Sequence, residues 1–287
     1  MIDLLLEPFT YDFMFTTVYV TCLIGALCAF LSAFLMLKGW SLMGDALSHS
    51  IIPGVVGAYM LGLPFSLGAF FSGGLAAGAI LFLNERTKLK EDAIIGLIFT
   101  SFFGIGLFMQ SKASIPIKLD AVILGNLGSI AIEDIIQLVI IGVVSIAIML
   151  VIWKDLLVTF FDENHARSIG INTKLLKIIF FTLLAASTVA AMQTVGAFLV
   201  IALVVTPGAT AYLLSDRFSR LLLIAIAIGI FTSFFGSYIS YFLNVQPGGF
   251  IVLLQTALFI IAFFFAPKHG YIAARLKAKQ ALEDDHA

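Results

Sequence analysis

Long apolar runs recur along this 287-residue chain and constrain its fold more than any other feature. Each run is about 20 residues long, the length that an α-helix needs to cross the hydrocarbon core of a bilayer. Charged residues make up only 11% of the chain, against roughly 25% in soluble domains. Because a helix satisfies its backbone hydrogen bonds within one segment, as lipid requires, the sequence predicts an all-α, polytopic membrane protein.

About nine transmembrane spans are predicted, and together they form a single transmembrane domain over residues 1–287. The second and third are separated only by a Gly-Leu-Pro turn, so a tilted or broken pair is an alternative there. The moderately apolar stretch 113–132 contains Pro116, Lys118 and Asp120 and is interpreted as interfacial or re-entrant. The predicted spans are 13–37, 46–62, 64–83, 93–110, 134–153, 175–193, 195–214, 221–242 and 248–266.

The basic residues are distributed unevenly about these spans. When successive loops are assigned to alternate sides of the membrane, 14 of the 16 lysines and arginines fall on one side, and only Lys112 and Lys118 on the other. Cytoplasmic loops carry the excess of basic residues. The sequence therefore predicts a cytoplasmic C-terminal tail, at about 267–287, and an N-terminus outside.

Asp45 and His49 form a polar pair beside an apolar span. Residues four apart share one face of a helix, and ionisable side chains near hydrocarbon are costly enough to indicate a functional site. His49 is the only one of the four histidines within a predicted span. One oxygen and one nitrogen donor suit a divalent transition metal, and a second copy of the chain would supply two more. In the alternative interpretation, Asp45 caps the second span and His49 is an interfacial residue.

The segment at about 155–174 is the longest polar stretch between spans. Asp162 can cap a short helix that continues through Arg167 and ends at Gly170. Two interpretations stay open: a plain surface loop, or a docking surface for a soluble partner, with Phe160 and Phe161 leading into it.

Two further patterns concern helix packing. Pro207 lies inside the seventh predicted span, where it removes a backbone hydrogen bond and kinks the helix. That kink serves either packing or the lining of a substrate path. Gly74 and Gly78 form a GxxxG pair, which indicates close packing between helices.

Motifs for catalysis are absent from the sequence. It contains no GxxxxGK[ST] phosphate-binding loop, no HExxH and no serine elbow. The chain is therefore expected not to be an enzyme, and it cannot hydrolyse ATP in the usual way. No permanently bound cofactor and no nucleic-acid partner are expected.

Four longer stretches carry a resemblance to a known family. They are Lys-Gly-Trp-Ser-Leu-Met-Gly-Asp-Ala-Leu-Ser-His-Ser-Ile-Ile-Pro-Gly at 38–54, Phe-Phe-Asp-Glu-Asn-His-Ala-Arg-Ser-Ile-Gly at 160–170, and the blocks 194–200 and 206–211. The first resembles the signature of the ABC-3 family of metal permeases, the membrane subunits of manganese, iron and zinc importers. The second resembles that family's ATPase-coupling helix. The likeness covers essentially the whole chain and is closest to the manganese/iron branch.

The resemblance implies a type II importer fold and alternating-access transport of manganese(II) or iron(II), or alternatively zinc(II), across a bacterial inner membrane. It implies membrane lipid around the chain and three protein partners: cytoplasmic ATP-binding subunits, a second permease subunit of the same or a related chain, and a periplasmic metal-binding protein. It also implies that Asp45 and His49 contact the metal. The implied ATPase-coupling residues are Asp162, Glu163, Asn164, His165, Ala166, Arg167 and Gly170.

A secondary, ion-coupled metal transporter is the rival from another class. Proton coupling in such a transporter usually needs several buried carboxylates, and here Asp45 alone qualifies. A membrane enzyme is disfavoured because no catalytic constellation is present.

Overall fold

The chain folds into a bundle of long α-helices in a computed structural model that describes residues 7–40, 42–113, 130–267, 270–273 and 275. Within these ranges eight helices are long and apolar enough to cross a membrane, and no strand occurs. This confirms the predicted all-α class. The eight helices are α2 (Asp12–Lys38), α5 (Phe65–Arg86), α6 (Glu91–Ala113), α8 (Ile132–Phe161), α10 (Thr173–Val195), α11 (Ala197–Leu214), α12 (Phe218–Leu243) and α13 (Pro247–Phe265). The shorter elements are η1 (Glu7–Thr10), α3 (Met43–Ser50), α4 (Ile52–Leu61) and α9 (Glu163–Ser168).

The second predicted span is broken into two short helices, α3 and α4, which meet at Ile51. Pro53 has no N–H to donate to the carbonyl of His49, and its ring crowds that carbonyl. The expectation of one continuous span over 46–62 is therefore wrong, and the break lies at Ile51, ahead of the Gly-Leu-Pro turn that separates the second and third predicted spans. The predicted re-entrant segment lies, over 114–129, outside the described residues.

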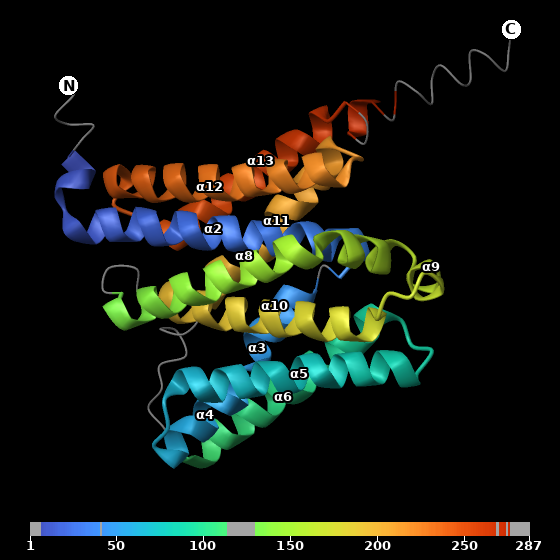
Figure 1. Cartoon of the computed structure of the whole chain (residues 1–287). Coiled ribbons are helices and arrows are strands. Elements are labelled where there is room, and N and C mark those ends of the chain that lie inside the picture. The colour runs from blue at the N-terminus through green and yellow to red at the C-terminus, as the bar shows by residue number, and fades with distance from the viewer. Residues whose placement is uncertain (1–6, 41, 114–129, 268–269, 274, 276–287) are drawn as a thin grey trace, which may run out of the picture.

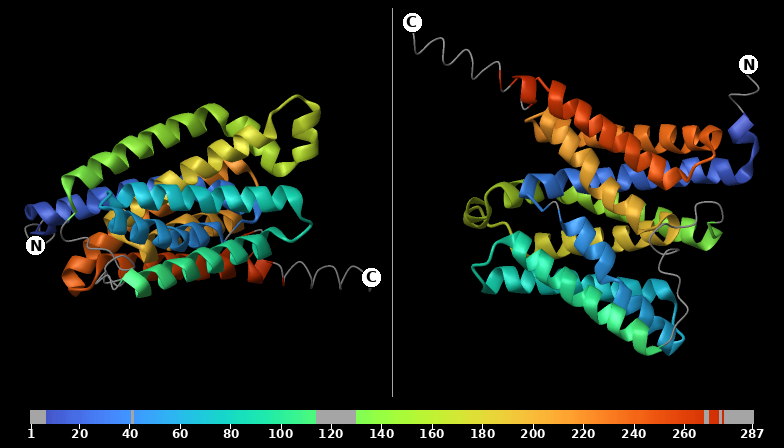
Figure 2. Two further views of the ribbon diagram at one scale, coloured as in Figure 1. Left: turned by 90° about the horizontal axis from the view of Figure 1, so that it is seen from below. Right: turned by 180° about the vertical axis from the view of Figure 1, so that it is seen from behind.

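The long helices form three groups (Figure 1). α2 packs against α11 and α12, with α13 beside them; α8 and α10 are central; and α4, α5 and α6 form the third group. In the view from below, α8 lies on one face of the bundle and α6 and α13 on the opposite face (Figure 2). α3 lies between α10 and α5 and also contacts α6 and α11. The helix that carries Asp45 and His49 is thus inside the bundle.

Glycine allows α4 and α5 to cross backbone to backbone. A Cβ atom on Gly54 would lie 2.0 Å from the carbonyl oxygen of Gly68, so neither position has room for a side chain. A Cβ atom on Gly74 or Gly78 would meet nothing within 4 Å. The interpretation of Gly74 and Gly78 as a close packing site is therefore wrong within this chain, and the close crossing of α5 is at Gly68.

The proline in α11 is accommodated by a hydroxyl from α2. Ser32 Oγ accepts a hydrogen bond from the N–H of Gly208 over 3.0 Å and donates one to the carbonyl of Val205 over 3.2 Å. A neighbouring helix thus satisfies backbone groups on both sides of Pro207, as membrane helices require. These contacts favour packing as the role of the kink.

Candidate functional site

Asp45 and His49 lie on one face of α3 and are in contact. His49 Nε2 is 3.3 Å from Asp45 Oδ1, and the two side chains are 23% and 40% exposed, respectively. The N-cap position of α3 is Leu42, so Asp45 lies inside the helix. The interpretation of Asp45 as a helix cap is therefore wrong. The pair instead presents an oxygen and a nitrogen donor side by side.

Two phenylalanines of α6 hold the imidazole ring of His49. The ring centroids of Phe99 and Phe103 each lie 5.5 Å from the centroid of His49, and both contacts are edge-on. Packing of this kind orients the ring without occupying its nitrogen atoms. Sequence reasoning missed this pair, because its i, i+4 spacing does not stand out among 28 phenylalanines.

The remaining faces of α3 are packed against other helices. A Cβ atom on Gly44 would lie 2.7 Å from Cγ1 of Val204 in α11, so the two helices approach closely. Ser72 of α5 donates a hydrogen bond to the carbonyl of Ser50 over 2.6 Å. Ala46, Leu47 and Ser48 are buried. These contacts fix how α3 presents Asp45 and His49.

The pair does not complete a metal site by itself. No group of three or more His, Cys, Asp and Glu side chains comes together in the part of the chain that the structure describes. A carboxylate oxygen and an imidazole nitrogen are donors that divalent transition metals accept. A four-coordinate ion held here therefore needs two further donors from another source.

The segment 162–170 contains the short capped helix that the sequence predicts. Asp162 accepts a hydrogen bond from the N–H of His165 over 3.0 Å, and α9 follows, with Ala166 as its buried residue. Gly170 has a φ of +86°, a left-handed conformation that glycine adopts without strain. The chain can then turn sharply into α10.

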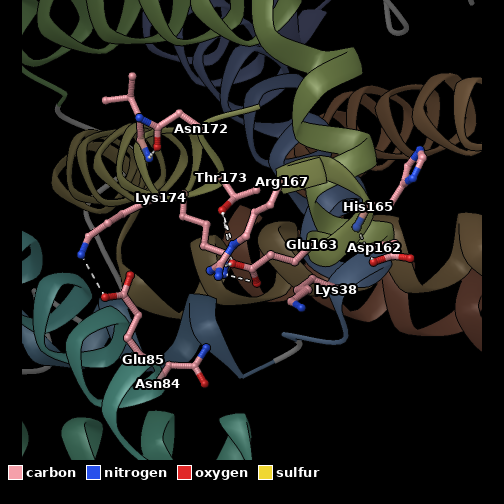
Figure 3. Close-up of polar contacts among 12 residues, drawn as sticks. Lys38, Asn84, Glu85, Asp162, Glu163, His165, Arg167, Asn172, Thr173 and Lys174 are labelled. Carbon is pink, nitrogen blue, oxygen red and sulfur yellow. Dashed lines mark hydrogen bonds and ion pairs between the residues drawn. The ribbon is translucent and has the colours of Figure 1, made fainter. Parts of the chain in front are cut away.

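Glu163 is the centre of an ionic network that joins α9 to α10 (Figure 3). Its carboxylate lies 2.5 Å from Lys177 Nζ and 2.6 Å from an Arg167 nitrogen, and it also accepts a hydrogen bond from Thr173. Burial acts to raise the pKa of Glu163, but the hydrogen bonds and charges of Lys177 and Arg167 outweigh burial and lower this pKa. Lys177 itself is only 8% exposed. Sequence reasoning missed its role, because nothing local pairs it with Glu163.

The network extends to a third helix. Lys174, in the first turn of α10, forms an ion pair of 3.0 Å with Glu85 near the end of α5 (Figure 3). Ion pairs thus link α9 to α10 through Glu163, and α10 to α5 through the more exposed Lys174–Glu85 contact.

The residues around α9 divide into exposed and buried. Phe161 is 82% exposed and Ile169 57%, whereas Phe160 is buried. Large exposed apolar side chains at a segment outside the long apolar helices indicate a surface that a partner covers. Of the two aromatic residues predicted to lead into a docking surface, Phe161 alone is thus accessible. The polar residues exposed beside it are Asp162, Asn164, His165, Arg167 and Ser168.

Comparison with known proteins relates the whole chain to one group of transporters. The family model described as "ABC 3 transport family" matches residues 10–266. The "Chelated iron transport system membrane protein YfeC" of Yersinia pestis is 59% identical over 279 residues, which cover 97% of this chain and 95% of that protein. The "Manganese transport system membrane protein MntB" of Synechocystis is 43% identical over 283 residues, which cover 98% and 92%.

A solved structure shows the same fold. It is described as PsaBC from Streptococcus pneumoniae in complex with Fab, and its matching chain is 32% identical. The two superpose with a TM-score of 0.83 over 96% of this chain and 100% of that chain.

Proposed function

Since the chain belongs to the ABC 3 transport family, we propose that it is the permease subunit of an ATP-driven importer of manganese(II) or iron(II). The contact between Asp45 and His49 carries the proposal, because it places two donors suited to such an ion on a helix inside the bundle. The relatives named for iron and for manganese transport support both ions. Zinc(II) is the alternative cargo.

The ion is held between two permease chains. Each chain offers one carboxylate oxygen and one imidazole nitrogen, so a pair of chains offers four donors, enough for a closed coordination shell. The second chain is a further copy or a related permease. Ligation of this kind is transient, because a transport site that binds too tightly cannot release its ion.

Separate ATP-binding subunits drive the cycle from the side on which α9 lies. The exposed Phe161 and Ile169 and the polar residues of α9 form the docking surface, and the Glu163 network carries closure to α10. A periplasmic metal-binding protein delivers the ion to the opposite face. The chain lies in the inner membrane with its C-terminus in the cytoplasm and its N-terminus outside, as the excess of basic residues on one side indicates. Alternating access then needs two arrangements of the helices around α3.

Metal uptake by proteoliposomes that contain the assembled transporter tests the site. Asp45→Asn and His49→Gln should each lower manganese uptake about tenfold or more, the scale of losses at metal sites, and should leave assembly with the ATPase intact. Asp92→Asn, a carboxylate exposed in the first turn of α6, is the matched control and should transport normally. Normal uptake by both site variants would refute the metal-binding role of the pair.

Omission of the ATP-binding subunits separates this proposal from the secondary transporter. Uptake should then stop, and an imposed proton gradient should not restore it. Uptake that persists without those subunits would contradict the proposed function.

A further inference from the structure

Trp40 is buried where several elements of the site meet. It is 3% exposed, and its ring centroid lies 5.4 Å from that of Phe160 and 4.9 Å from that of Phe181. Its indole N–H donates a hydrogen bond to the carboxylate of Glu91, so the polar edge of the ring is satisfied inside an otherwise apolar contact. Three helices, α8, α10 and α6, thus hold one side chain.

Two of these contacts lead to α9. Phe160 is the second residue before Asp162, the N-cap of that helix. Phe181 lies four residues after Lys177 on the same face of α10, and Lys177 binds Glu163 of α9. The Trp40 ring is therefore connected to α9 by two routes, one through α8 and one through α10.

The other contacts lead to the metal-binding pair. The carbonyl of Trp40 accepts a hydrogen bond of 3.2 Å from the N–H of Met43, the first residue of the helix that carries Asp45. Glu91, which holds the indole N–H, is the first residue of α6. Further along the same helix, Phe99 and Phe103 pack on His49. The backbone of Trp40 is thus linked to the helix that carries Asp45, and its side chain is linked to the helix whose phenylalanines pack on His49.

Glu91 is itself anchored on both sides. Asn84 of α5 donates a hydrogen bond to it over 3.2 Å, and Lys38 at the end of α2 lies 3.8 Å from it. Lys38 Nζ also lies 5.6 Å from the centroid of the Trp40 ring. These contacts hold the indole and the start of α6 together.

We propose that Trp40 is a positioning residue that transmits the displacement of α9 to Asp45 and His49. The inference rests on the proposed transport function. Packed interiors move between discrete arrangements rather than deforming continuously, so a buried ring in contact with both ends is suited to couple them. If the role of Trp40 were purely structural, its replacement would lower the stability of the protein. The number of ions transported for each ATP hydrolysed would then stay unchanged.

The number of manganese ions transported for each ATP hydrolysed distinguishes these roles. Trp40→Phe keeps an aromatic ring but removes the N–H, and Glu91→Gln weakens the acceptor and leaves the indole in place. Each should lower the ratio about tenfold, the scale seen when a supporting contact of a metal ligand is lost. The ratio of the double variant should be no lower than that of the more affected single variant, because both substitutions act on the same hydrogen bond. Trp153→Phe, at the other tryptophan of the chain, should stay within about twofold of wild type.

Each outcome has one meaning. An unchanged ratio in Trp40→Phe and Glu91→Gln that assemble normally would overturn the inference, as would effects that multiply in the double variant or an equal loss in Trp153→Phe. If Trp40→Phe does not assemble, Glu91→Gln decides alone. Failure of the wild-type transporter to couple ATP to uptake would refute the proposed function itself, and that result is visible before any substitution is made.

Discussion

Glu163 lies between a buried and an exposed cation, and these two partners differ in what they contribute to stability. The Lys177 side chain is 11% exposed, whereas the Arg167 side chain is 61% exposed. A buried ammonium group that loses its opposite charge costs far more than an exposed one does. The Lys177 contact therefore dominates the stability of the α9–α10 junction.

Glu163→Gln should lower the free energy of unfolding by about 1–2 kcal/mol, less than for a fully buried pair because Glu163 is partly exposed. Thermal unfolding of the purified protein in detergent measures this loss. The matched control is Glu85→Gln, which removes the more exposed ion pair with Lys174 and should cost less than about 1 kcal/mol. Equal effects of the two substitutions would contradict the importance of burial.

The pH dependence of stability follows from the lowered pKa of Glu163. The folded state favours the ionised carboxylate, so this contribution is fully present above the ordinary glutamate pKa of 4.5. It is lost as the pH falls through the lowered pKa of the folded state. The stability difference between wild type and Glu163→Gln should therefore be constant near neutral pH and shrink in acid. A difference that grows in acid would contradict the ion pair.

At the scale of helices, α4 and α5 show that the contact made by a glycine decides its role. Gly68 touches the backbone of Gly54, whereas Gly74 on the same helix meets nothing within 4 Å. The local sequence does not distinguish them, because close approach depends on which face of α5 meets α4. The GxxxG pattern therefore pointed to the wrong glycines.

Gly68→Ala should destabilise the protein by about 2 kcal/mol, because the added methyl group forces α4 and α5 apart. Gly74→Ala is the control on the same helix and should be neutral or stabilising by up to about 1 kcal/mol, since alanine favours helix formation. Unfolding midpoints in one detergent give both values. A loss in Gly74→Ala as large as that in Gly68→Ala would refute the crossing described here.

The long helices could be predicted because the hydrocarbon core of a bilayer requires apolar side chains along the whole span, and this requirement leaves a long apolar run in the sequence. The run 195–214, for example, becomes α11 at Ala197–Leu214. The break at Ile51 could not be settled in the same way. Pro53 predicts a kink. Whether the helix continues past that kink depends on the helices that pack against α3 and α4 in the fold.

At the scale of the whole molecule, the Asp45–His49 pair is half of the proposed metal site. The assembled transporter should therefore bind one manganese ion for every two permease chains. Equilibrium dialysis of the purified complex against saturating manganese measures this ratio without requiring tight retention, with His49→Gln as the control that should bind little metal. One tightly bound ion for each chain would contradict a site shared between two chains.

The candidate site was predictable where its residues are neighbours in sequence. Asp45 and His49 share one short helix, and Asp162 and Gly170 bound another, so spacing alone brings each set together. Trp40, Phe99 and Lys177 come from separate segments, and their contacts exist only after the helices have packed. Such contacts leave no periodic signal in a single sequence.

Because of the interruption at Ile51, α3 is a short helix that is separated from α4 at one end and from α2 at the other. On one side, Gly39 has a φ of +78° and ends α2; on the other, α3 ends at Ser50 and α4 starts at Ile52. Asp45 lies five residues from the Ser50 end of α3, a distance of about 7.5 Å along the helix axis. A tilt of about 15° around that end would displace Asp45 by about 2 Å, roughly the length of one metal–oxygen bond. A small rotation of these eight residues would therefore be enough to separate one ligand from the ion of the proposed site.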